Sequence, residues 1–318
     1  MPGSGRMRFG CRRRSGSGSM RSGRAWDWNE GRKGVVFVSI RGHVNNIALH
    51  HMVFALPFAY MSAFLAEGGV PPLWDLFWIT VAIGGARSAA LALDNLADLK
   101  YDKQQKRLAY RPMVRGEVSP RAAKISIVVY LLVFLVAVLQ LHPLCIRLLP
   151  LAVVPFLVYP FTKRFTCLCH FVLGIAISMA PAGAWVAIRG SIDPPLVLLC
   201  LAVALWIGMF DAVYGAQDEN FDRLHGLHSL ATAFTAKGDL FIAKALHAVS
   251  IACFFALGWM LQLHTVYFFG VGLAAGTLYY QHSIVKPNDF HRVTQVYFMR
   301  NGIVSLAMFA FTWLALYL

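Results

Sequence analysis

Charged residues are scarce in this chain. Of its 318 residues, 14% are Asp, Glu, Lys or Arg and 58% are hydrophobic, whereas a typical soluble domain has about 25% charged residues. This composition excludes an ordinary soluble domain. Acidic residues are the scarcer kind, 15 against 29 Lys and Arg, and ten of the basic residues precede residue 44. Because much of the remaining basic charge lies in a few loops, no basic folded face is visible, and we exclude nucleic acid as a partner.

The chain also lacks features that would indicate other classes. Its six cysteines lie mostly in apolar runs, and only Cys167 and Cys169 are closely spaced, so we interpret them as small core residues. The first 43 residues contain no apolar signal-peptide core and are rich in Gly, Ser and Arg. They predict a disordered N-terminal segment over 1–43, followed by a membrane domain over 44–318. The segment either remains without a role, binds anionic lipid heads through its charge, or is a translated leader ahead of a start such as Met20.

Long apolar runs are what the chain has in abundance. Several approach the length of about 20 residues that a helix needs to span a bilayer. Backbone groups in a bilayer must be hydrogen-bonded within the chain, so these runs predict helices. We therefore predict an all-α, polytopic membrane protein in the lipid bilayer, built as a bundle of nine transmembrane helices. The predicted spans are roughly 44–66, 72–97, 121–141, 144–160, 167–189, 194–216, 239–261, 264–282 and 296–317.

The connections between these runs differ in charge. The segment before the first run and the connections after the second, fourth, sixth and eighth runs are basic. The alternate connections, EGGVPP, HP, RGSIDP and LHT, are short and nearly uncharged. The positive-inside rule therefore predicts a cytoplasmic N-terminus and an external C-terminus, in the cell inner membrane or its equivalent.

A first acidic motif follows the second run, at its predicted cytoplasmic end. Asp94, Asp98 and Asp102 are four residues apart, which on a helix places them on one face. Because three such carboxylates repel one another, a positive group must lie between them. Mg²⁺ is the hard cation that carboxylates bind while leaving positions for phosphate oxygens. Arg107 and Arg111 follow, so the stretch predicts a metal-bridged phosphorylated ligand.

A second acidic motif follows the sixth run. Asp211, Asp218 and Asp222 are spaced by seven and four residues and are predicted to share a helix face. Two such motifs could hold two Mg²⁺ ions against one diphosphate. The rival interpretation is an ion-coupled transporter, in which intramembrane acids mark an ion path. A transporter places its acids near the midplane on broken helices, whereas these motifs lie at the cytoplasmic ends and are followed by basic residues.

These residues resemble the motifs of the UbiA superfamily of intramembrane aromatic prenyltransferases. The first family motif matches Asp94, Asp98, Asp102, Arg107 and Arg111-Pro112; the second, DxxYxxxDxxxD, matches Asp211, Tyr214, Asp218 and Asp222; a third, YxxxKRxT, matches Tyr159, Lys163, Arg164 and Thr166. Asp94 stands where the family usually has Asn. Leu99 stands where relatives that use hydroxybenzoate commonly have Arg, which puts that acceptor in doubt. The segments FALPFA, GLHSLA and FMRNG are most similar to the hydroxybenzoate-type and menaquinone-pathway members.

The resemblance implies a function and a set of site residues. The function is Mg²⁺-dependent transfer of a polyprenyl group from a polyprenyl diphosphate to an aromatic acceptor, in ubiquinone or menaquinone biosynthesis. The acceptor is of the 4-hydroxybenzoate or naphthoate type, or else another lipid precursor. A central cavity open to the cytoplasmic side would hold both substrates. The expected metal ligands are Asp94, Asp98, Asp102, Asp218 and Asp222; the expected diphosphate-binding residues are Arg107, Arg111, Lys163, Arg164 and His228; the expected catalytic residues are Asp211, Tyr214 and Lys163. Asp211 either accepts or orients the acceptor's proton, or is a further metal ligand.

Polar and small residues within the apolar runs give further expectations. His50-His51 and Asn301 are intramembrane polar residues, which usually face the bundle interior. A pocket role and a buried, hydrogen-bonded role are both open for them. For His228, the alternative to diphosphate binding is a structural role. Small residues at Gly84-Gly85, Gly174 and Ala180–Gly183 predict close packing between helices.

Overall fold

The computed structural model describes residues 42, 46, 54–287, 290 and 298–318. Within this part every assigned element is a helix, which confirms the predicted all-α class. The predicted segment 1–43 lies almost entirely outside the described residues, as do His50 and His51. The long helices are α2 (Leu56–Glu67), α3 (Leu73–Ala97), α5 (Pro120–Leu139), α6 (Pro143–Thr162), α7 (Cys169–Arg189), α8 (Pro194–Gly215), α10 (Leu230–Met260), α11 (Val266–Ile284) and α12 (Phe298–Tyr317).

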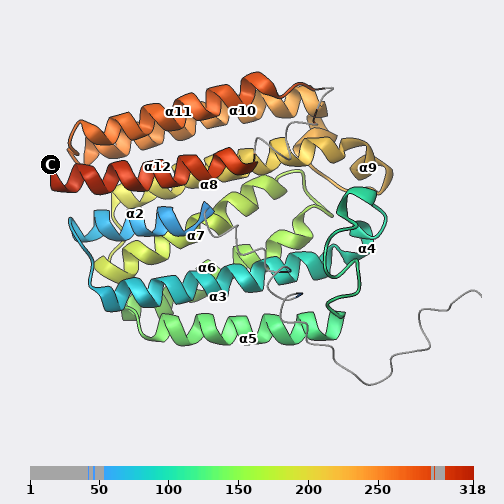
Figure 1. The fold of residues 1–318 in the computed structure, drawn as a ribbon, viewed down its shortest axis with the longest axis horizontal. Coiled ribbons are helices and arrows are strands. Elements are labelled where there is room, and N and C mark those ends of the chain that lie inside the picture. Colours follow the sequence, from blue (N-terminus) through green and yellow to red (C-terminus); the bar gives the residue numbers. More distant parts are fainter. Residues whose placement is uncertain (1–41, 43–45, 47–53, 288–289, 291–297) are drawn as a thin grey trace, which may run out of the picture. The chain divides into compact units, whose positions relative to one another are not determined.

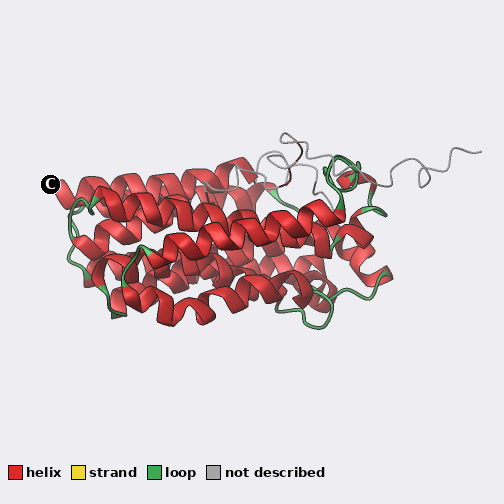
Figure 2. Cartoon of the chain, turned by 90° about the horizontal axis from the view of Figure 1, so that it is seen from below, coloured by secondary structure: helices red, strands yellow, loops and turns green. Residues whose placement is uncertain are grey.

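These helices pack as a bundle in which sequence neighbours and more distant elements lie side by side (Figures 1 and 2). Helix α8 packs against both α7 and α10, α3 packs along α5, and α2 lies against α7 and α12. Large side chains are fully buried between them, and the burial of this apolar surface stabilises the packing of the helices. The largest are Trp185, Trp206, Tyr267, Phe58 and Phe254.

Six helical segments are long and apolar enough to cross a membrane. They are Leu73–Ala97, Pro120–Leu139, Pro143–Thr162, Cys169–Arg189, Pro194–Leu224 and Leu230–Met260. Helices α2, α11 and α12 coincide with the three remaining predicted runs but are not among these six in the described part of the chain. The membrane class is therefore supported, and the count of nine spans stays a prediction.

Local sequence explains where several helices begin. Pro120 and Pro143 occupy first-turn positions, where the missing N–H needs no partner. Before them, Ser119 Oγ accepts a hydrogen bond from Ala122 N at 3.2 Å, and His142 Nδ1 accepts one from Leu144 N at 3.2 Å. The predicted start of the seventh run at 239 lies just after a kink at Thr235 (φ 65°, ψ 161°), which divides α10 into a short first part and a long second part. Helix α10 begins at Leu230 because Ser229 and Thr232 form a capping box.

Glycines allow two close helix contacts. A Cβ at Gly85 would lie 2.9 Å from Phe134 N, where α3 meets α5. A Cβ at Gly174 would lie 2.2 Å from Ala204 O, where α7 meets α8. The packing prediction is confirmed at these positions. It was wrong at Gly183, where a Cβ would have no other atom within 4 Å.

Candidate functional site

The chain bends at the middle aspartate of each acidic motif. Helix α3 ends at Ala97, Asp98 has φ −90° and ψ 0°, and the short α4 (Leu99–Asp102) follows. Helix α8 ends at Gly215, and a 3₁₀ turn, η3 (Ala216–Asp218), leads into α9 (Glu219–Leu224). The prediction of one continuous helical face for each motif was therefore wrong. The apolar sequence that sustains α3 and α8 stops at these points, and polar residues continue the chain in short helices.

The acids of both motifs face basic side chains. Arg111 Nη1 donates to Asp102 Oδ2 at 2.6 Å. Arg107, on the 3₁₀ turn η2 (Lys106–Leu108), donates from Nη2 to Asp218 Oδ2 at 2.6 Å and from Nη1 to the Tyr214 hydroxyl at 3.1 Å. Arg107 thereby joins the first motif's loop to the second motif.

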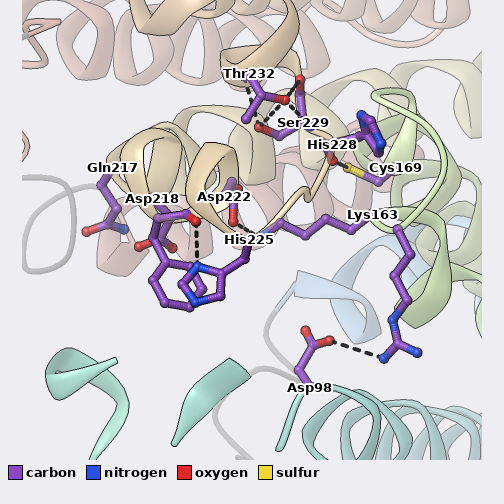
Figure 3. A network of polar contacts seen from close by, with 12 residues as sticks. Asp98, Lys163, Cys169, Gln217, Asp218, Asp222, His225, His228, Ser229 and Thr232 are labelled. Atoms are coloured by element: carbon purple, nitrogen blue, oxygen red, sulfur yellow. Dashed lines mark hydrogen bonds and ion pairs between the residues drawn. The ribbon is translucent and has the colours of Figure 1, made fainter. Parts of the chain in front are cut away.

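Lys163 and Arg164 complete this arrangement from the end of α6. Lys163 Nζ lies 3.1 Å from Asp222 Oδ1, and Asp222 is 0% exposed. Figure 3 shows the Lys163 side chain extending toward Asp222. Arg164 Nη2 lies 4.0 Å from Asp98 Oδ1 and donates to Ala97 O at 2.8 Å. We call these residues the charged cluster: Asp98, Asp102, Arg107, Arg111, Lys163, Arg164, Asp218 and Asp222.

Some carboxylate oxygens of the cluster nevertheless lack a close partner. Burial, and then the nearby Asp94 carboxylate, raise the pKa of Asp98 to about 7. The second oxygen of Asp222, Oδ2, is buried and has no hydrogen-bond partner among the described residues. No group of three or more His, Cys, Asp or Glu in the described part of the chain is gathered tightly enough to hold a metal ion. The four acids of the charged cluster each face a base instead. The donor set, hard carboxylate oxygens, is still the one that suits Mg²⁺.

A cavity of about 880 Å³ adjoins the charged cluster through Arg111 and Tyr214, which line it. Most of its wall is apolar and comes from α3, α5, α6, α7 and α8. Its lining on α3 runs from Ile79 to Asn95, which is about 24 Å at 1.5 Å per helical residue. The cavity is therefore long and apolar, with polar side chains at one end. That end is lined by Asp94, Arg111, Tyr159, Asp211 and Tyr214.

The structure separates the predicted site residues into three groups. Four line the cavity, namely Asp94, Arg111, Asp211 and Tyr214. Seven lie in the charged cluster without lining the cavity, namely Asp98, Asp102, Arg107, Lys163, Arg164, Asp218 and Asp222. His228 belongs to neither group. Its backbone N donates to Lys163 O at 2.7 Å, and it lines a separate small cavity with Cys167 and Arg223.

Sequence reasoning missed several polar residues that lie near this site. Arg87 and Asn95 line the cavity from α3. Arg87 interacts electrostatically with Tyr159 and Asp94, but its buried Nε has no hydrogen-bond partner in the described part of the chain. His170 and Asp239 are buried on α7 and α10. Arg87 stands alone among small and apolar residues, and this isolation was the signal that could have revealed it, whereas Asp239 is flanked by Lys237 and Lys244.

Asn301, in contrast, is buried and hydrogen-bonded within the bundle. Its Oδ1 accepts a hydrogen bond from Trp206 Nε1 at 3.0 Å, and its side chain is buried. This geometry supports the buried, hydrogen-bonded role that was one of its two predicted roles.

Comparisons with known proteins agree with this geometry. The chain is 32% identical over 245 residues to a 4-hydroxybenzoate octaprenyltransferase of Klebsiella pneumoniae, covering 77% of this chain and 84% of the relative. A Vibrio cholerae protein of the same name is 32% identical over 246 residues, covering 77% and 86%. Among solved structures, a UbiA homolog from Aeropyrum pernix K1 superposes with a TM-score of 0.71 at 30% identity, covering 83% of this chain and 95% of the homolog.

A more distant structure shares the fold. The UbiA homolog from Archaeoglobus fulgidus, solved with DMAPP and Mg²⁺, superposes with a TM-score of 0.69 at 18% identity, covering 87% of this chain and 99% of that one. The family model described as the UbiA prenyltransferase family matches residues 55–316, which include both acidic motifs, the charged cluster and most of the cavity lining. With bundle, motifs and relatives in agreement, the chain belongs to the UbiA prenyltransferase family, and the prediction of a prenyl-transferring enzyme is confirmed.

Proposed function

We propose that the protein transfers a polyprenyl group from a polyprenyl diphosphate to an aromatic acid of the 4-hydroxybenzoate type, with Mg²⁺ as cofactor. The observation that carries this proposal is the cavity, which is apolar over most of its wall and polar at the end next to the charged cluster. A polyprenyl diphosphate is divided in the same way, into an apolar tail and an anionic head. The hydroxybenzoate-using relatives and the Mg²⁺-bound homolog support the same assignment.

The diphosphate head would lie at the charged cluster. Guanidinium groups bind phosphate oxygens in pairs, so Arg107 and Arg111 would exchange their carboxylate partners for the diphosphate, together with Lys163. The released carboxylates, with Asp94, would hold the metal. They are Asp98, Asp102, Asp218 and Asp222. When bound there, Mg²⁺ would neutralise the charge that develops on the leaving diphosphate oxygens.

The acceptor would bind in the polar end of the cavity, against Arg87. This cation lines the cavity wall and forms no hydrogen bond or ion pair with a described residue. Asp94 and Tyr159 interact with it electrostatically without a direct hydrogen bond, and the carboxylate of an aromatic acid would supply a hydrogen-bonded partner for this buried cation. Leu99 lies outside the cavity lining, so its lack of a positive charge does not argue against a carboxylate-bearing acceptor.

The chemistry follows from this placement. The bond between the allylic carbon and the diphosphate oxygen breaks, and the diphosphate leaves with the electron pair. Aromatic faces of Tyr159, Tyr214 and Phe210, all in the cavity lining, stabilise the allylic cation. The ring of the acceptor then forms the new carbon–carbon bond and releases a proton to Asp211, which lines the same end. Because Asp211 lies in the cavity rather than in the charged cluster, we assign it to the acceptor rather than to the metal.

A product assay tests the proposal. Membranes containing the protein are incubated with Mg²⁺, a polyprenyl diphosphate and either 4-hydroxybenzoate or a 1,4-dihydroxynaphthoate-type acceptor, and products are identified by mass. We expect prenylated hydroxybenzoate, loss of product with EDTA, and recovery when Mg²⁺ is restored. Product from the naphthoate alone would replace the acceptor assignment with the menaquinone branch. Undiminished turnover in excess EDTA would contradict the metal role.

We also propose nine spans with the charged cluster on the cytoplasmic side. The basic connections support this orientation, and α2, α11 and α12 occupy the positions of the remaining predicted spans. Exposed residues on alternate connections allow a test: Val70→Cys and Lys103→Cys, each in a cysteine-free background, are treated with a membrane-impermeant thiol reagent on intact cells. Only Val70→Cys should react before the cells are opened. Reaction at Lys103→Cys alone would reverse the orientation.

A further inference from the structure

A buried histidine contacts the aspartate that lines the polar end of the cavity. His170 Nδ1, on α7, lies 2.8 Å from Asp211 Oδ2, on α8. An ionised carboxylate accepts hydrogen bonds and cannot donate them, so Nδ1–H is the donor. His170 is buried and does not line the cavity, whereas Asp211 does. His170 is therefore behind Asp211, as viewed from the cavity.

Glycines on α8 make room for this contact. A Cβ at Gly208 would lie 2.7 Å from His170 O, and a Cβ at Gly215 would lie 3.3 Å from His170 Cε1. These glycines precede and follow Asp211 by three and four residues, so the three positions share a helix face. Side chains at either glycine would push α7 and its imidazole away from Asp211. The backbone is thus shaped to bring His170 against this carboxylate.

A second carboxylate, that of Asp239, interacts electrostatically with the imidazole. His170 Nε2 is buried and accepts or donates no hydrogen bond among the described residues, and both carboxylate oxygens of Asp239 on α10 are buried without partners there. Asp239 has its strongest charge interaction with His170, followed by Asp211 and Glu219. The imidazole therefore interacts with carboxylates from two different helices, and it is hydrogen-bonded to the one on α8.

From this geometry we infer that His170 is a positioning residue for Asp211 in the transfer reaction. By engaging Oδ2, His170 holds the carboxylate so that Oδ1 remains to receive the proton that the acceptor's ring carbon releases. In that step the ring C–H bond breaks, its electron pair returns to the ring, and the proton bonds to the Asp211 carboxylate. This inference rests on the proposed function, because it requires an aromatic acceptor that loses a ring proton.

The test measures proton removal itself. The wild-type enzyme, His170→Phe and His170→Asn are assayed with a polyprenyl diphosphate and with ordinary or ring-deuterated 4-hydroxybenzoate. We expect His170→Phe to lower kcat about 10- to 100-fold, within the contribution of a general base of roughly 100-fold or more, with KM for the diphosphate unchanged. We also expect a primary deuterium isotope effect that the wild type lacks, because proton removal becomes slow. His170→Asn should recover much of kcat, since its amide nitrogen lies near the position of Nδ1.

His247→Phe is the matched control. His247 is likewise buried and hydrogen-bonded, to His282 at 2.8 Å and to Trp206 O at 3.0 Å, but neither of these partners lines the cavity. An isotope effect in His170→Phe alone supports the inference. A loss of kcat without an isotope effect, or equal behaviour of the control, overturns it. If His170→Phe does not fold, His170→Leu gives the same comparison. If the wild type prenylates no aromatic acceptor, the proposed function fails instead.

Discussion

At the scale of single residues, the paired charges of the cluster have two roles that can be distinguished. Asp98 and Asp218 lie at the bends of the two motifs, and each faces an arginine. Asp98→Asn and Asp218→Asn keep the shape of the side chain and remove its charge. We expect each to lower kcat at least about 100-fold, the usual effect of removing one transition-state charge contact. Turnover with a polyprenyl diphosphate measures this.

The control for these variants is Asp75→Asn. Asp75 is an acid in the first turn of α3, at the opposite end of that helix from Asp98. It should leave turnover unchanged. Near-normal turnover in both cluster variants would refute the metal-site proposal.

Lys163 is expected to contribute to stability as well as to catalysis. Its partner Asp222 is 0% exposed, so Lys163→Met leaves a buried carboxylate without its cation. Breaking a buried ion pair in this way costs about 3–5 kcal/mol, and the thermal unfolding midpoint in detergent should fall. Adding Asp222→Asn should restore much of the midpoint but none of the turnover. A double variant with full activity would show that the pair is only structural.

Sequence reasoning found these charged residues because they recur at fixed spacing beside basic residues. It could not find their pairing, since Arg107 and Asp218 are brought together only by the fold. Arg87 and His170 carry no spacing pattern. Their roles depend on a cavity and a helix crossing, which are tertiary features that the sequence alone does not reveal.

At the scale of elements, the crossing of α7 and α8 depends on Gly174. Gly174→Ala places a methyl group 2.2 Å from Ala204 O, a backbone atom that can move only with its helix. We expect a loss of about 1–3 kcal/mol, as for other overpacked contacts, seen as a lower thermal midpoint. Gly183→Ala on the same helix is the control, because nothing lies within 4 Å of the added carbon. Equal midpoints for the two variants would contradict this account of the crossing.

Helix existence was easier to predict than helix ends. Apolar runs located all the long helices, and Pro143 marked the start of α6. The short first part of α10, from Leu230 to the kink at Thr235, was missed because it is mixed in polarity and only its capping residues reveal it, whereas the long part after Thr235 was located to within a few residues. The bends at Asp98 and Asp218 were missed because a four-residue spacing is equally compatible with one helix or two.

At the scale of the whole molecule, the length of the cavity should limit the prenyl donor. Gly183 lines the cavity, and a Cβ there meets open space. A phenylalanine at this position would therefore occupy volume that a prenyl tail needs. We expect Gly183→Phe to lower kcat/KM for a long donor by about 10-fold or more, and to spare a two-isoprene donor. The estimate assumes that several methylene groups of the prenyl tail are no longer buried in the cavity, at a cost of about 0.8 kcal/mol each.

Parallel assays with the two donors measure this preference. Gly183→Ala is the control, since one methyl group should leave the long donor accepted. Equal losses for the short and long donors would show that the tail does not follow this part of the cavity.

The pairing of acids with bases in the charged cluster has a kinetic consequence. Because opposite charges already neutralise one another there, the resting site presents little field to solvent. A free cation or a free anion would have to displace a partner of its own sign, whereas a Mg²⁺–diphosphate complex supplies both signs at once. Substrate capture should accordingly proceed with metal and diphosphate arriving together, and its rate should depend only weakly on ionic strength.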